Sequence, residues 1–573
     1  MTSRIERACI TTLVVLVRPA GATAQQLHPV DVYVAMQQAH ELYRTGKPED
    51  AATAFARLTE HAAWDGKFWF EYGVILRQLG QRREAAAAWE KTYALGFTPR
   101  PELAILIAEL HARLGEKEQA LTWLETGLAH FLADRQRLQR DSAFLAYHGE
   151  PRFARISGMA KTKGLTRTAG WQLDVDFLVM EAKRLHASFD REAFSAAFAQ
   201  AARTLRARIA RLTDAEIFME MRKLLALLKD GHSNVHPDPN APRLPVDLYF
   251  FRDGLFVVDG SGEGEPLIAS RVVAIGGKSV DSLLRGLAAY TPKDNGMQVR
   301  WLAPNALTLP IALHALGAAP DSTQATFTVQ RDNQPAQIVT LHTVKDRPAM
   351  RKLRPPREST DTVPLYLQKI NRGAAAINEE AVYYWFAPLP SADAVYFQFN
   401  QIVPMQSESI QQFASRLQRA LREGNAKNLI VDVRHNNGGD SFLFAPLLRV
   451  IIWFEQDDAD HRIYYIMGRN TFSAAQNFTT EVEQKTNAIL VGEPSSSRPN
   501  FTGEEWMFKL PYSQTTANVS FRYNQRSDWL DDRVWIPPHV PVELTSDDYF
   551  RNRDPALEAV LELIRRNAKG PER

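Results

Sequence analysis

Cysteine is almost absent from this sequence of 573 residues, in which Cys9 is the single example. Charge of one sign is lacking as well, since 68 basic residues stand against 66 acidic ones and leave a formal net charge of +2. A chain without excess charge has no overall field that would capture polyanions or anionic lipid. The composition therefore argues against nucleic-acid binding.

The start of the chain lacks an apolar run long enough to cross a membrane. The run from Ala8 to Val17 spans ten residues, whereas a transmembrane helix needs about twenty. It follows Arg4 and Arg7 and precedes Ala22-Thr-Ala24, which has the small-x-small form of a signal-peptidase site. This pattern predicts a signal peptide over residues 1–24 and an exported protein, periplasmic or secreted, without stable membrane insertion; the alternative is a frayed or misassigned start.

Removal of residues 1–24 would also remove Cys9 and leave a mature chain without thiols. This excludes a disulfide framework, a cysteine nucleophile and a thiolate metal site, and it suits a protein that must survive an oxidising compartment.

The apolar content of 45% is enough for two or three hydrophobic cores in a chain of this length. Three similar segments are centred on Gly46, Gly80 and Gly115, at separations of 34 (80 − 46) and 35 (115 − 80) residues. A glycine turn followed by a small residue at this period is typical of tetratricopeptide repeats. We therefore expect an all-helical array over residues 25–160, which would bind a protein partner or act as a rigid spacer or a dimerisation module.

The remaining sequence changes character three times. Helical periodicity continues over 165–240 and ends in Lys229-Asp-Gly-His-Ser233, and residues 241–345 are β-rich and similar to a PDZ domain. Residues 346–374, rich in Arg, Lys and Pro, predict a solvated linker. Strands and helices then alternate over 375–573, which predicts an α/β core and makes the whole chain a multidomain α/β protein.

Two segments of the predicted α/β core carry residues suited to chemistry. The apolar strand Leu429–Val433 leads into Asn436-Asn-Gly-Gly439, a turn whose backbone N–H groups are unobstructed by side chains, as an oxyanion hole requires. The next strand leads to Ser473 at a strand-to-helix junction, where the N–H of Ala474 can face a developing negative charge. Taken alone, this segment favours a plain helix N-cap role for Ser473 over a catalytic one.

Together, Lys229-Asp-Gly-His-Ser, Asp432-Val-Arg-His-Asn-Asn-Gly-Gly, Thr471-Phe-Ser-Ala-Ala-Gln-Asn-Phe and Val491-Gly-Glu-Pro resemble, in order and context, the tail-specific or C-terminal-processing serine peptidases. The resemblance covers residues 170–565 and includes the tricorn-like branch. It implies a crotonase- or Clp-like peptidase core, a polypeptide substrate, and an acyl-enzyme mechanism without metal or organic cofactor. Ser473 would be the nucleophile, with Gly439 and Ala474 forming the oxyanion hole.

The family uses either a Ser–Lys dyad or a serine assisted by a histidine and an acid. At the position of the dyad lysine this chain has Arg498, which cannot lose its proton at a useful pH. Lys485 is nearer but reads as a solvated turn residue. The resemblance therefore implies His232 as the general base, with His236 and His435 as rivals.

The orienting acid implied by the resemblance is Asp532, with Asp531 as the alternative. Trp535 and His539 depart from the Gly and Asp of the family pattern and leave this assignment open. Three other functions stay open: an inactive relative that binds peptide or lipid, a scaffold acting through the helical repeats, and a Ser–Lys enzyme with a lysine elsewhere.

Overall fold

The computed structural model describes residues 29–130, 132–187, 192–332, 334–345, 347, 349–350, 352–356, 363–369 and 382–569. The signal peptide predicted over 1–24 lies outside these residues. The chain divides into two compact units, Met1–Met159 and Ala160–Arg573.

The first unit is all-helical, because pairs of short amphipathic helices alternate with glycine turns. Gly46, Gly80 and Gly115 each end a helix with a positive φ of 76° to 79°, a conformation that favours glycine. Ala51, Ala85 and Ala120 are fully buried where paired helices meet. The helices are α1 (Pro29–Arg44), α2 (Pro48–His61), α3 (Gly66–Gln78), α4 (Arg82–Ala94), α5 (Arg100–Arg113), α6 (Lys117–Ala129) and the short α7 (Pro151–Ser157).

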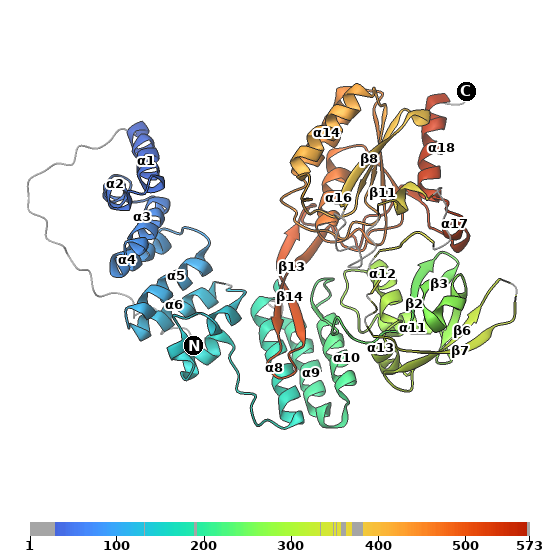
Figure 1. The fold of residues 1–573 in the computed structure, drawn as a ribbon, viewed down its shortest axis with the longest axis horizontal. Helices are drawn as coiled ribbons and strands as arrows, with labels where there is room; N and C mark the ends of the chain where they lie inside the picture. Colours follow the sequence, from blue (N-terminus) through green and yellow to red (C-terminus); the bar gives the residue numbers. More distant parts are fainter. Residues whose placement is uncertain are drawn as a thin grey trace, which may run out of the picture. The chain divides into compact units, whose positions relative to one another are not determined.

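The second unit begins with a group of three helices, α8 (Arg167–Leu185), α9 (Glu192–Arg208) and α10 (Asp214–Ala226). A long hairpin, β13 (Asn500–Lys509) and β14 (Thr516–Gln525), reaches from the other end of the sequence onto α8 (Figure 1). The short strand β1 (Asn234–Val235) pairs with β14, which gives the order β1-β14-β13. The hairpin therefore joins the three-helix group to the remainder of the unit.

A small β-rich part follows in the chain. Its strands are antiparallel and lie in the order β2-β3-β4-β6-β7, with β5 paired to β4. These elements are β2 (Val246–Phe251), β3 (Gly254–Gly260), β4 (Arg271–Ile275), β5 (Lys278–Ser279), α11 (Val280–Leu287), α12 (Gly296–Ala306), α13 (Pro310–Ala315), β6 (Gln324–Gln330) and β7 (Gln337–His342).

The α/β core is built on a six-stranded sheet in the order β15-β12-β11-β10-β9-β8, in which only β8 is antiparallel to its neighbour. Strands β9 and β10 are buried along their whole length, as expected for strands covered on both faces. The strands are β8 (Tyr384–Leu389), β9 (Ala394–Phe399), β10 (Asn428–Asp432), β11 (Arg462–Met467), β12 (Ile489–Gly492) and β15 (Val540–Pro541).

Helices cover both faces of this sheet. Apolar residues of α14 (Ile410–Glu423), α15 (Ala445–Asp457) and α16 (Ala474–Lys485) pack on one face, and α18 (Pro555–Lys569) packs on the other. The short α17 (Ser546–Phe550) precedes α18. This architecture establishes a multidomain α/β protein.

The described part of residues 346–374 differs from the predicted solvated linker. Leu353, Tyr366 and Leu367 are almost fully buried and belong to one apolar cluster with Phe251 and Tyr549. The prediction was based on the abundance of Arg and Pro and overlooked these few apolar residues. Their burial packs the segment against the β-rich part and the core.

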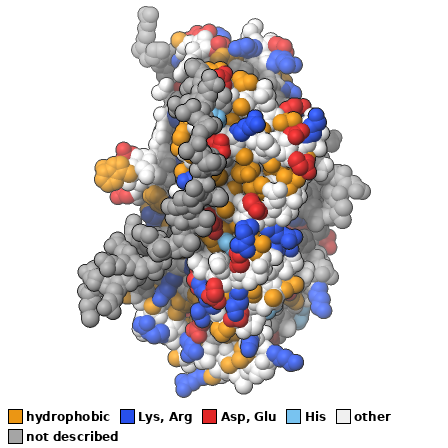
Figure 2. All heavy atoms as spheres, turned by 90° about the vertical axis from the view of Figure 1, so that its left-hand side faces the viewer, with side chains coloured by type: hydrophobic (Ala, Val, Ile, Leu, Met, Phe, Trp, Pro, Cys, Tyr) orange, Lys and Arg blue, Asp and Glu red, His pale blue; other side chains and the backbone are white. Residues whose placement is uncertain are grey.

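The surface agrees with the balanced composition. On the face drawn in Figure 2, acidic and basic side chains are interspersed around hydrophobic ones. Within the residues that the structure describes, no helix is long and apolar enough to cross a membrane.

Candidate active site

Ser473 stands where the turn after β11 enters α16. Its backbone has φ 57° and ψ −125°, a strained conformation for a residue with a side chain. Although Ser473 occupies the N-cap position, its side chain makes no capping hydrogen bond. Its Oγ lies 2.9 Å from Nε2 of His232 instead. The simple N-cap interpretation of Ser473 is therefore excluded.

His232 belongs to a loop after α10 that is fixed by hydrogen bonds to its backbone. The carboxylate of Asp230 accepts the N–H groups of His232 and Ser233 at 2.9 and 2.6 Å, and its other oxygen pairs with His186 at 2.8 Å. Asn518 of β14 donates to the carbonyl of His232. Burial opposes the charge of Asp230, but these hydrogen bonds and His186 lower its pKa.

Aromatic rings hold the imidazole itself. The ring of Phe472 stacks on His232 with centroids 4.3 Å apart, and Phe501 of β13 stacks at 5.5 Å with an interplanar angle of 5°. Trp301 of α12 packs against Phe472 at 5.6 Å. The hairpin, the β-rich part and the core thus each help to orient His232 toward Ser473.

The Gly-Gly turn lies against the nucleophile. A Cβ on Gly438 would stand 2.8 Å from Cβ of Ser473 and 3.0 Å from the nitrogen of Ala474. The carbonyl of Gly438 accepts the N–H of Ile402, so the N–H of Gly439, on the opposite side of the same peptide, points away from Ile402. Ala474 is the first residue of α16, where an N–H has no intrahelical acceptor. Both groups suit the predicted oxyanion hole.

Neither rival histidine is engaged with Ser473. His236 pairs with Asn518 at 2.6 Å, and burial lowers its pKa. His435 stacks on Tyr366 and lines a separate cavity at the ends of β11 and β12. Burial and neighbouring cations hold the pKa of His435 well below its usual value.

The two candidate cations of a dyad are also occupied elsewhere. Lys485 ends α16, about 18 Å along the helix axis from Ser473, and pairs with Glu481 one turn earlier. Arg498 donates from Nε to the carbonyl of Asp294 at 3.3 Å. Neither contact resembles that of a general base.

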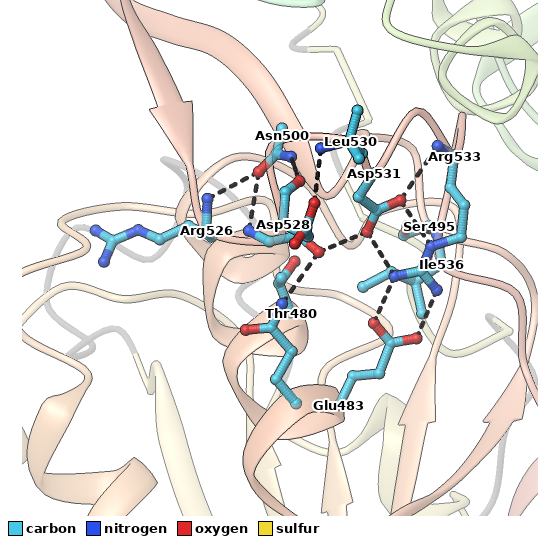
Figure 3. A network of polar contacts seen from close by, with 12 residues as sticks. Thr480, Glu483, Ser495, Asn500, Arg526, Asp528, Leu530, Asp531, Arg533 and Ile536 are labelled. Atoms are coloured by element: carbon cyan, nitrogen blue, oxygen red, sulfur yellow. Dashed lines mark hydrogen bonds and ion pairs between the residues drawn. The ribbon is translucent and has the colours of Figure 1, made fainter.

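The expectation that Asp532 orients His232 is corrected by the structure. Asp532 is exposed, and Nδ1 of His232 is buried without a hydrogen-bond partner among the described residues. The next residue, Arg533, binds Glu483 of α16 through two hydrogen bonds of 2.8 and 2.9 Å, which tie this loop to that helix (Figure 3).

The alternative, Asp531, belongs to the same structural network (Figure 3). It pairs with Arg533 at 2.8 Å and accepts a hydrogen bond from Ser527 at 2.6 Å. These contacts lower the pKa of Asp531 to about 2. Its carboxylate therefore stabilises the loop and does not reach the imidazole.

Sequence reasoning missed the residues that support His232. Asp230 could have been noticed, because it stands two positions before the histidine. Phe501 and Asp294 lack a local signal, since they reach the loop from distant parts of the chain. Asp294 accepts the N–H of Gly231 at 2.8 Å across 63 positions.

A cluster of three or more His, Cys, Asp or Glu side chains able to hold a metal ion is not found within the described part of the chain. The chemistry that the site's own residues can support is proton transfer between His232 and Ser473 next to the backbone N–H groups of Gly439 and Ala474.

The fold is that of the tail-specific serine proteases, a class of serine-type peptidases. The mature form of CPAF, a tail-specific protease, aligns with 70% of this chain and 99% of its own, with 13% identity and a TM-score of 0.50. The photosystem II D1 C-terminal processing protease aligns with 69% of this chain and 97% of its own, with 13% identity and a TM-score of 0.34. No family model and no curated protein sequence matches the chain.

Proposed function

We propose that this protein is a serine endopeptidase that hydrolyses polypeptides through an acyl-enzyme on Ser473. The observation that carries the proposal is the 2.9 Å contact between His232 Nε2 and Ser473 Oγ at a strained strand-to-helix junction. A serine hydroxyl is a weak nucleophile until a neighbouring base takes its proton, and imidazole is suited to this near neutral pH.

In the proposed reaction, Ser473 Oγ attacks the scissile carbonyl carbon while His232 Nε2 takes the hydroxyl proton. The N–H groups of Gly439 and Ala474 stabilise the oxyanion. His232 then protonates the leaving amine, and the C–N bond breaks to give the acyl-enzyme. A water molecule, deprotonated by His232, releases the carboxylate product and restores Ser473.

A fluorophosphonate probe tests this assignment, because it labels only an activated serine. The full chain should be labelled and should hydrolyse an unfolded protein, whereas Ser473→Ala should do neither. His232→Ala should lose nearly as much, since the two residues act as one unit. Lys485→Ala is the matched control and should behave as the unaltered protein.

Two outcomes would overturn the proposal. Labelling that survives in Ser473→Ala would place the nucleophile elsewhere. A folded but unlabelled and inactive parent protein would instead favour an inactive relative that binds peptides or lipids.

The proposal extends to the rest of the chain. The predicted signal peptide supports an exported enzyme, and the helical repeats offer a surface for a protein partner, as such arrays commonly do. Neither is needed for the chemistry at Ser473.

A further inference from the structure

Among the buried polar atoms that have no hydrogen-bond partner within the described residues are Nδ1 of His232 and Oδ2 of Asp294, which lies beside the histidine loop. Such atoms are costly to bury, and a general-base histidine needs its second nitrogen held by an acceptor. In its active tautomer His232 carries the Nδ1 proton, because Nε2 must accept the proton of Ser473. A carboxylate oxygen is the complementary group.

Asp294 is fixed beside the histidine loop from several directions. It lies between α11 and α12, and its Oδ1 accepts the N–H of Gly231 at 2.8 Å. Its own N–H donates to Oε1 of Gln298 at 2.9 Å, and Nε2 of Gln298 donates to the carbonyl of Gly231 at the same distance. The segment therefore holds the residue adjacent to His232 by both its N–H and its carbonyl.

The same segment is tied to the nucleophile side of the site. Asn295, the N-cap of α12, donates from Nδ2 to the carbonyls of Ser495 and Val534 at 3.2 and 2.6 Å. Ser497 Oγ, which lies near the Asp294 carboxylate, accepts the N–H of Ser473 at 3.4 Å. Asp294 is thus anchored to both halves of the candidate site.

The electrostatics fit an acid that acts on the imidazole. Burial raises the pKa of Asp294 to about 6; the charge of His232 opposes this rise, the charge of Asp230 adds to it, and hydrogen bonding from Ser497 and Gly231 lowers the pKa. At pH 7 the group is therefore mainly ionised. A protonated His232 favours the ionised form of Asp294. The ionised carboxylate of Asp294 in turn stabilises the imidazolium of His232.

The other charged groups around His232, Asp230 and Arg498, form hydrogen bonds with other partners. Asp230 uses one oxygen on His186 and the other on the backbone of residues 232 and 233 and on Ser520. Arg498 faces the carbonyl of Asp294 and not its carboxylate. Asp230 therefore holds the loop, and Asp294 is the carboxylate that remains available to the ring.

We propose that Asp294, supplied by the β-rich part of the chain, is the acid that positions His232, in the place expected for Asp532. It accepts the Nδ1 proton directly or through one water molecule and stabilises the imidazolium that forms during acyl transfer. Asp294 is a positioning residue, since it acts on Ser473 only through His232. This inference rests on the proposed peptidase function.

The test is the pH profile of kcat/KM for hydrolysis of an unfolded protein by the full chain. In Asp294→Asn the amide oxygen can still accept the N–H of Gly231, but the charge is lost. We expect kcat to fall at least about tenfold with little change in KM. The acid limb should move to lower pH, because an ionised carboxylate no longer stabilises the protonated form of the base.

Matched variants decide between the candidates. Asp281→Asn removes an exposed carboxylate from neighbouring α11 and should leave the profile unchanged. Asp532→Asn should also keep the original acid limb. If Asp294→Asn does not fold, Asp294→Glu replaces it, and the acid limb should then stay in place because the charge is kept.

The failure of this inference is distinct from failure of the peptidase proposal. An active protein whose Asp294→Asn variant keeps its kcat and acid limb would overturn the role of Asp294, as would a downward shift of the limb in Asp294→Glu. A shift produced by Asp532→Asn alone would return that role to Asp532. An inactive, unlabelled parent protein would overturn the peptidase proposal itself.

Discussion

Gly438 sets how closely the oxyanion turn can approach the nucleophile. Its φ of 107° is strained for any other residue, and an added Cβ would meet Ser473 at 2.8 Å. We predict that Gly438→Ala lowers the rate of peptide hydrolysis by about 100-fold or more, the scale for loss of one oxyanion donor. Hydrolysis and fluorophosphonate labelling, measured beside the melting temperature, check this.

Gly149→Ala is the control for Gly438→Ala, because a Cβ at Gly149 meets nothing within 4 Å. It should leave hydrolysis unchanged. A Gly438→Ala variant with the parent rate would show that the turn takes no part in catalysis.

At the level of residues, the sequence is informative where chemistry depends on a short motif. Ser473 and His232 each stand in such a motif, and the structure brings them together. Asp532 shows where prediction from the sequence fails. Its spacing from Ser473 does not indicate that the neighbouring Arg533 forms an ion pair with Glu483. Asp294 could not be found, because the contact that matters joins it to residue 231 across 63 positions without a pattern around it.

Among the elements, the β13–β14 hairpin connects the three-helix group to the site. Asp174 of α8 is fully buried and accepts the N–H groups of Tyr512 and Ser513 at the hairpin tip, at 2.7 and 2.8 Å. The rings of Trp171 and Tyr512 pack beside this contact. The hairpin then carries Phe501 to the imidazole of His232.

We predict that Asp174→Ala lowers the free energy of unfolding by about 1–3 kcal/mol, because two partly buried N–H groups lose their acceptor. Hydrolysis should fall as well, since a displaced hairpin loosens the stacking on His232. Denaturant unfolding and steady-state kinetics measure the two effects. Asp176→Ala, an exposed residue of the same helix, should change stability by less than about 0.5 kcal/mol.

Helices and strands with a regular hydrophobic pattern could be predicted from the sequence. The contacts by which these elements pack against one another could not. The alternation after residue 375 gives the parallel sheet, because apolar strands buried on both faces require helices between them. The hairpin contact with α8 joins positions 338 apart through a single carboxylate. The buried anchors of residues 346–374, such as Tyr366, escaped notice for the same reason.

At the scale of the whole molecule, every residue of the candidate site belongs to the second compact unit. We predict that residues 160–573 alone keep the fluorophosphonate labelling and most of the hydrolytic rate of the full chain. An inactive but folded fragment would show that the first unit contributes to catalysis.

The first unit should fold by itself, because its repeats bury a continuous core between neighbouring helices. We predict a mainly helical circular dichroism spectrum and a cooperative thermal transition for residues 25–160. A disordered or β-rich spectrum would contradict this.

We also predict that the exported protein begins at Gln25, because the small-x-small pattern ends at Ala24. N-terminal sequencing of the mature protein measures this, and an intact Met1 would contradict it.

Ser473 and His232 are 241 positions apart in the chain, and the rings around the imidazole come from still other segments. A chain that has been synthesised only as far as the β-rich part therefore contains the base without its nucleophile. Closing such long loops is slow, so the site forms late in folding. On the proposed mechanism, the base and its nucleophile therefore meet only once the α/β core has closed onto the loop of His232.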